Sequence, residues 1–428
     1  MGTTNIPYGS PLANKVQSAG LFAANMQRQT TLNRLTGPMP KQAEAESRLG
    51  RRQSSNTMPI VRAQDLTKGV GDEVTFDLVN PMGGKPIMGD AVAEGRGMAL
   101  TFNQDRLRIN QARYPVNAGS TMTQQRTPHQ MRTLARAAAN GLMEGYSDQS
   151  ILVHMAGARG FHNNIEWNVP LESDPDFANV MVNRVKAPSR NRHLVVSGDS
   201  LTGVVPNAGA MTIQTTDVMT MDTVDAIGML LDSMALPPPP VKMEGDKAAS
   251  DAPLRVLLVS GEQYGWFIKT GQFRQLQANA MARAQQAGQH PLFMGQAGMW
   301  NNTLLVKMPK PIRFYAGDTI KYCASYDSEA ESSVVVPAGF STTHAVDRAL
   351  LLGGQALAEA WGNHPKSGTS YFWSEKETDH EDKLEVSVAA IGGRSKIRFE
   401  MDFGNGKQIT DFGVIAIDTA VKLATPRG

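Results

Sequence analysis

Hydrophobic and polar positions alternate with a period of two between residues 70 and 118, which predicts strands. Val74, Phe76 and Leu78 alternate with polar residues, and a second such run contains Phe102 and Leu107. About 20 irregular residues rich in glycine and proline separate the two runs. The pattern predicts a long β-hairpin. Because an isolated pair of strands is marginally stable in water, we expect a partner surface to hold it.

The hydrophobic spacing becomes helical after this hairpin. Thr127 supplies a capping hydroxyl and Pro128 suits the first helical position. Apolar residues then recur at helical spacing as far as Ala156, and glycines follow as stop signals. We expect one helix over residues 127–156, about 45 Å long at 1.5 Å per residue.

Shorter elements follow in mixed order. Helical spacing predicts helices at 220–234, 271–287 and 343–361, and apolar runs predict strands at 254–260, 302–307, 384–391, 396–401 and 413–418. Strands and crossover helices do not alternate, so the fold class is α+β. The 428 residues exceed the roughly 250–300 at which a single core stops growing, so we expect two lobes or large excursions.

Charge is unevenly distributed along the chain. Residues 1–70 carry nine lysines and arginines against three acids, a net charge of +6, whereas the whole chain carries +2 and the remainder therefore −4. A basic first segment suits a polyanion or an acidic partner surface, and a solvated tail is equally compatible with the composition. Its arginines of interest are Arg28, Arg34, Arg48, Arg51 and Arg52.

Candidate catalytic motifs are incomplete. Asp411-Phe412-Gly413 spells the metal-binding triplet of a protein kinase, but the other kinase motifs are missing, so we interpret it as a turn entering a buried strand. The single cysteine, Cys323, excludes an internal disulfide and is expected to be a small buried hydrophobe. The histidines are dispersed, and no apolar run is long enough to span a membrane. We therefore expect no enzyme, no cofactor, no metal site and no membrane partner.

Several sequence blocks between residues 70 and 420 keep a characteristic order. They include Gly71–Pro86, Gln124–Pro128, His290–Gly295, Arg348–Gly353 and Asp411–Ile415. In order and spacing these blocks resemble the major capsid proteins of N-four-like podophages and their relatives.

The resemblance implies a Hong Kong 97-type coat fold and a division of the chain. The expected parts are an N-terminal arm at 1–69, an extended loop at 70–118, a peripheral domain at 119–215 with a spine helix at 127–156, an axial domain at 216–380 with an insertion loop at 236–252, and C-terminal strands at 381–428 that return to the peripheral domain. Loop residues expected to contact a neighbouring subunit are Val74, Phe76, Leu78, Lys85, Phe102 and Leu107. The arm arginines would face packaged DNA or clamp a neighbouring subunit.

The function implied is that of a major capsid protein of a tailed bacteriophage. Such a chain self-assembles into hexamers and pentamers of an icosahedral shell around double-stranded DNA. Its partners would be its own copies, the packaged DNA, and portal, scaffold, decoration or cement, and head-fibre proteins. It would be assembled in the host bacterial cytoplasm and would reside in the virion capsid.

Three other functions stay open at this point. The same fold could form the shell of a cellular nanocompartment around an enzyme, which the content of purified particles would reveal. A hydrolase or transferase with an unrecognised site is a second alternative, although no motif supports it. A DNA-binding regulator is a third, but the sequence has no helix-turn-helix or zinc pattern.

Overall fold

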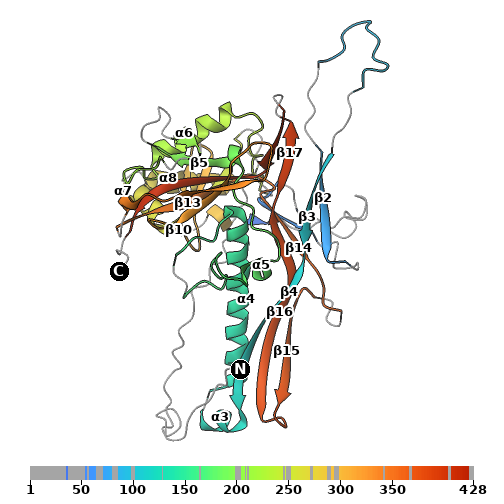
Figure 1. Ribbon diagram of the computed structural model, residues 1–428, viewed down its shortest axis with the longest axis vertical. Helices are drawn as coiled ribbons and strands as arrows, with labels where there is room; N and C mark the ends of the chain where they lie inside the picture. Colours follow the sequence, from blue (N-terminus) through green and yellow to red (C-terminus); the bar gives the residue numbers. More distant parts are fainter. Residues whose placement is uncertain are drawn as a thin grey trace.

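The structure is a computed structural model of the 428-residue chain. The residues that it describes are 35–36, 54, 57–63, 71–79, 85–97, 102–127, 129–162, 165–197, 204–207, 209, 212–243, 246, 252–269, 273–286, 291–293, 298–340, 343–365, 369–402 and 406–423. In this part of the chain, two sheets of more than two strands form separate regions of an elongated molecule (Figure 1).

The first sheet has β16 as its central strand. Gly392 of β16 pairs with a residue of β4 on one side and of β14 on the other, and Ala390 pairs likewise with β4 and β15. β1 extends the sheet beyond β14 in parallel. The five strands are β1 (Ile60–Ala63), β4 (Asn110–Ser120), β14 (Leu357–Trp361), β15 (Tyr371–Thr378) and β16 (Lys383–Lys396).

Helix α4 (Met131–Ala156) runs along this sheet (Figure 1). Its Met143 and Tyr146 belong to one apolar cluster with Val388 of β16. Every residue from Asp148 to Ala156 is buried, because this end of the helix lies between the two sheets. None of the described helices is long and apolar enough to cross a membrane.

The predicted start of the long helix is wrong by four residues. Ser120 caps a separate short helix, α3 (Thr121–Arg126), by accepting a hydrogen bond from the backbone N–H of Thr123. Thr127 has an extended backbone (φ −125°, ψ 140°), which is the conformation that a residue before proline favours. The chain therefore turns at Thr127, and α4 begins at Met131.

The second sheet carries helices on one face and the end of α4 on the other. Its strands run in the order β6-β5-β19-β13-β7-β9-β8, and β10 pairs with β13. They are β5 (His193–Val196), β6 (Val204–Pro206), β7 (Arg255–Val259), β8 (Gly298–Trp300), β9 (Thr303–Lys307), β10 (Ile312–Phe314), β13 (His344–Leu352) and β19 (Val414–Lys422). The covering helices are α6 (Met221–Ser233), α7 (Gly261–Lys269) and α8 (Phe273–Gln286).

The helix predicted over residues 343–361 is wrong, because this segment forms strands β13 and β14. Along β13, Ala349 and Leu351 pack in the cluster that the helices cover, and Leu350 and Leu352 pack in the cluster on the opposite face. A strand that is buried on both faces shows no alternation of apolar and polar residues. Its apolar run therefore matched the helical template equally well.

Three hairpins complete the main elements. They are β2 (Glu73–Val79) with β3 (Phe102–Arg108), β11 (Thr319–Cys323) with β12 (Glu331–Val335), and β17 (Arg398–Asp402) with β18 (Lys407–Asp411). Shorter helical pieces are α5 (Phe177–Met181), η3 (Arg190–Arg192), η4 (Pro291–Phe293) and η5 (Ala338–Phe340). The predicted long hairpin is thus present between β2 and β3, paired from Glu73 with Arg108 to Val79 with Phe102.

Sheet membership divides the chain differently from the expected boundaries. Residues 110–118 of the expected loop belong to β4 of the first sheet, and β1 lies within the expected arm. β14 and β15 return to the first sheet before residue 381, whereas β19, at the C-terminal end, belongs to the second sheet. In the expected insertion loop, Val241 is buried and pairs with Leu254.

Candidate assembly surfaces and buried ion clusters

The root of the long hairpin is held by its own chain. Val74 and Leu107 are buried in one apolar cluster with Ala358 of β14 and Phe399 of β17. These two side chains were expected to contact a neighbouring subunit, but here they contact the same subunit. The reason is that β3 lies against β14, β16 and β17, whose apolar residues cover it.

The tip of the hairpin projects from the body of the molecule (Figure 1). Every described residue from 85 to 97 is exposed, Lys85 included. Met88 is 75% exposed and Val92 is 66% exposed. Gly89 and Gly95 have φ values of 59° and 77°, in the left-handed region that suits the turns of this segment. We call residues 85–97 the tip loop; its exposed apolar side chains have no described partner within the chain.

The other predicted contact residues fall in different places. Phe102, the first residue of β3, is 60% exposed. The side chains of Phe76 and Leu78 lie outside what the structure describes, as do the arm residues Arg28, Arg34, Arg48, Arg51 and Arg52. Within the arm, Leu35 is fully buried and Thr36 forms a parallel bridge to Ile60 of β1. The described part of the arm is therefore anchored on its own first sheet.

Sequence reasoning missed a set of ion clusters that lie mostly in the interior. In the first, the guanidinium of Arg348 on β13 donates to both carboxylate oxygens of Asp418 on β19, at 2.7 and 2.8 Å, and to the carbonyl of Ala156 at 3.0 Å. Asp418 also contacts Nε2 of His193 at 2.6 Å, and Asn207 contacts Nδ1 of the same ring at 3.0 Å. This cluster ties the C-terminal end of α4 to three strands of the second sheet.

The histidine of this cluster is a structural group. Burial lowers the pKa of His193, against the opposing attraction of Asp418, and both ring nitrogens already have partners. The ion pair with Arg348, together with the contact to His193, outweighs burial and holds the pKa of Asp418 well below its ordinary range. Both ring nitrogens are therefore occupied, and among the described residues no serine, threonine or cysteine side chain is hydrogen-bonded to the ring.

The second cluster lies at the aspartate of the kinase-like triplet. The carboxylate of Asp411 accepts hydrogen bonds from Arg398 Nε at 2.7 Å and from the backbone N–H of Ser189 at 3.0 Å. It also forms an ion pair with Lys396 Nζ at 2.8 Å. These interactions overcome burial and lower the pKa of Asp411 to about 2. The triplet is thus the turn between β18 and β19, as interpreted from the sequence. Its carboxylate is paired with the side chains of Lys396 and Arg398. Cys323 is buried beside Arg398, as expected for a small hydrophobe.

The third cluster stabilises the first sheet. Glu359 on β14 accepts from Arg62 Nε of β1 at 2.6 Å and from Arg394 Nε of β16 at 2.9 Å. Both Glu359 and Arg394 are buried, so each neutralises a charge that would be costly alone. A charge inside an otherwise apolar strand, as in Leu357–Trp361, is the sequence signal that would have indicated such a pair.

A buried aspartate on α4 predicts an unusual pH dependence. Burial raises the pKa of Asp148 to about 7, with Glu144 and Glu359 adding to the shift and Arg394 opposing it. Between about pH 4 and 7 the unfolded carboxyl ionises while the folded one keeps its proton. The free energy of unfolding therefore falls as pH rises, by roughly 4 kcal/mol for about three pKa units.

Asp148→Asn is expected to remove this loss. Relative to the wild type, the variant should be more stable by roughly 4 kcal/mol at pH 8 and nearly equal at pH 3. Urea unfolding of the full chain across this pH range measures the difference. The exposed Asp232→Asn on α6 is the control, with an expected change within about 0.5 kcal/mol. Parallel curves for wild type and Asp148→Asn would show that Asp148 is ionised in the folded protein.

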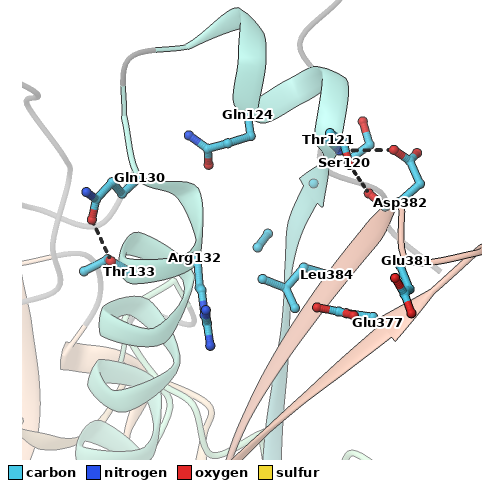
Figure 2. A pocket seen from close by; sticks show the side chains of 12 residues that line it. Ser120, Thr121, Gln124, Gln130, Arg132, Thr133, Glu377, Glu381, Asp382 and Leu384 are labelled. Carbon is cyan, nitrogen blue, oxygen red and sulfur yellow. Dashed lines mark hydrogen bonds between the residues drawn. The ribbon is translucent and has the colours of Figure 1, made fainter.

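An acidic pocket of about 400 Å³ lies where α3 and the start of α4 face the ends of β4 and β16 (Figure 2). Glu377, Glu381 and Asp382 line it together with the apolar Leu384. The backbone N–H of Thr121 donates to the carboxylate of Asp382 at 3.3 Å. Among the described residues, neither Glu377 nor Glu381 forms an ion pair. Arg132 also lines the pocket, but its guanidinium is paired with Glu375. Three acids and one arginine give the lining a net charge of −2.

The described residues include no group of three or more His, Cys, Asp or Glu that could hold a metal ion. The charged side chains that gather in the interior instead neutralise one another.

Solved capsid structures share this arrangement of elements. The capsid of Ralstonia phage GP4 matches with a TM-score of 0.71 and 24% identity, covering 100% of both chains. The cyanophage Pam1 capsid matches with a TM-score of 0.58 and 15% identity, over 99% of this chain and 100% of the other. The acid-stable capsid of Helicobacter pylori bacteriophage KHP30 matches with a TM-score of 0.51 and 11% identity, over 99% and 100%. These likenesses establish the fold.

Sequence comparison establishes the family. No curated protein matches the chain significantly. The profile of the family described as phage capsid protein, however, matches residues 5–423, nearly the whole chain. The resemblance inferred from the ordered sequence blocks is thereby confirmed, and the chain belongs to the phage capsid protein family as a structural component of a phage capsid.

Proposed function

We propose that this chain is the major coat subunit of a tailed phage and forms the hexamers and pentamers of an icosahedral shell around double-stranded DNA. The tip loop is the observation that carries the proposal. It is a projecting segment whose apolar side chains are exposed in the single chain, and burial against a neighbouring copy would stabilise them at about 25 cal/mol per Å².

The root of the hairpin is held by the subunit itself. Val74 and Leu107 lie in the apolar cluster of β14 and β17, so the paired strands β2 and β3 are positioned without a partner. A preordered hairpin root lowers the entropy lost on association. We assign the contact with a neighbour to Lys85, Met88, Val92 and Phe102, and the hairpin root to the subunit's own core.

The basic arm has two candidate partners. Its net charge suits packaged DNA, and it also suits the acidic pocket lined by Glu377 and Glu381 on a neighbouring copy. Portal, scaffold and decoration or head-fibre proteins complete the partners that we propose, with assembly in the host cytoplasm. Because the phage capsid protein family is structural, we propose no catalytic role.

Electron microscopy of particles purified after expression of the full chain with its phage's other head proteins tests this proposal. We expect closed icosahedral shells of pentamers and hexamers, with DNA inside that resists nuclease. Shells that instead enclose an enzyme would favour the nanocompartment alternative. Subunits that remain monomeric under these conditions at high concentration would contradict a shell of either kind.

A further inference from the structure

A second pocket, of about 760 Å³, collects lysines from three separate segments. Lys269 ends α7, Lys307 ends β9, and Lys422 ends β19, and all three side chains are exposed. We call this the lysine pocket. The Cε of Lys307 would lie 3.2 Å from a Cβ added at Gly261, so this side chain passes over the first residue of α7.

The positive charge of the lysine pocket is not balanced inside the chain. No described carboxylate forms an ion pair with any of the three lysines. The one acid in the lining, Glu262, is bound by Arg313 at 2.6 Å, and burial lowers the pKa of His162, which leaves that ring neutral at pH 7. Three lysines and one glutamate give the lining a net charge of +2. Gathering like charges is unfavourable unless an anion joins them.

An aromatic ring lies among these cations. Trp266 lines the same pocket, and its ring centre lies 5.7 Å from Nζ of Lys269. Basic groups around an aromatic face are typical of sites that bind nucleic acids, where lysines contact phosphates and the ring stacks on an unpaired base. A DNA duplex engages the lysines through its phosphates, and an unpaired segment engages the ring as well.

We propose that the lysine pocket binds phosphate groups of nucleic acid. The inference deepens the proposed function, on which it rests, by naming a contact with the enclosed genome that lies on the body of the subunit and not on the basic arm. The same phosphate chemistry is available from free nucleoside triphosphates, and the two sources differ in the number of contacts they offer.

Fluorescence anisotropy of purified, unassembled subunits with a labelled DNA duplex tests the pocket. Each phosphate contact contributes about 0.9 to the slope of log affinity against log salt concentration. Replacing Lys269, Lys307 and Lys422 by glutamine is expected to reduce that slope by about 2.7 and to weaken binding at least about tenfold at low salt. The matched control is Lys376→Gln, an exposed strand lysine on β15 outside the pocket, which should leave the slope nearly unchanged.

Competitors identify the ligand. A single-stranded oligonucleotide should compete and should lose affinity on Trp266→Leu, whereas inorganic triphosphate should compete only at much higher concentration. Equal competition by triphosphate would assign the pocket to small phosphates and overturn a nucleic-acid site, as would equal competition by polyglutamate for an acidic protein segment. An unchanged slope in the triple variant would also overturn it.

The outcome is separable from that of the proposed function. DNA binding is measured on subunits, so a failure of the wild type to form shells contradicts the coat function and leaves the pocket result intact. The triple variant should form shells at wild-type yield. Loss of shells with unchanged DNA binding would make the lysine pocket a contact between subunits and overturn the inference.

Discussion

Replacing Arg348 by methionine is expected to lower the free energy of unfolding by about 3–5 kcal/mol. Arg348 and Asp418 are both fully buried and share two hydrogen bonds of 2.7 and 2.8 Å. Methionine fills similar space but leaves the carboxylate of Asp418 without its guanidinium and the carbonyl of Ala156 without a donor. An unpaired buried charge costs far more than the pair contributes.

Urea unfolding of the full chain measures this change, and a surface pair supplies the control. Arg184 donates to Glu331 at 2.7 Å but is 58% exposed. Arg184→Met removes the same kind of side chain and should change stability by at most about 1 kcal/mol. Equal effects of the two substitutions would show that the Arg348 cluster does not stabilise the fold.

A double variant keeps the test informative if Arg348→Met does not fold. Adding Asp418→Asn removes the unpaired charge, so Arg348→Met with Asp418→Asn should recover soluble, cooperatively unfolding protein. Replacement of a whole buried pair by neutral groups is often close to neutral in stability. A double variant that is no better than Arg348→Met would place the defect in packing and not in charge.

The spacing of apolar residues predicted those strands and helices that have a polar, solvent-facing side along at least part of their length. The alternation around Val74 predicted the β2–β3 hairpin, and the helical spacing as far as Ala156 predicted α4. The same method failed at residues 343–361, where both faces of β13 are covered and an apolar run matches either template. The resemblance to phage capsid proteins supplied the fold that periodicity could not.

The buried ion clusters could not be predicted because their partners are far apart in the sequence. Arg348 and Asp418 are separated by 70 residues, and Arg394 and Glu359 by 35. Only strand register brings them together, since Arg348 pairs directly with Asp418 across β13 and β19. The hairpin had the same limitation. Alternation indicated that Val74 and Leu107 face an apolar partner, but it did not indicate whether that partner was the same chain or another copy.

Aspartate at two positions of the tip loop is expected to abolish shell assembly without changing subunit stability. Met88 and Val92 are 75% and 66% exposed, so Met88→Asp with Val92→Asp should alter the free energy of unfolding by less than about 0.5 kcal/mol. Burial of each side chain at a contact stabilises it by about 1.5–3 kcal/mol. Loss of both therefore weakens every contact by about 100-fold or more, at 1.4 kcal/mol for each factor of ten.

The measurement compares urea unfolding of the subunit with the yield of shells in electron micrographs. A loop that contacts only a neighbouring subunit should change the yield of shells and leave the stability of the subunit unchanged. Met229→Asp on α6 and Ile165→Asp are the controls, since these side chains are 64% and 90% exposed on the body of the subunit. They should permit assembly if the tip loop is the specific contact. Normal shells from the tip-loop variant would contradict the assignment, and so would a loss of subunit stability, because the loop would then belong to the subunit's own core.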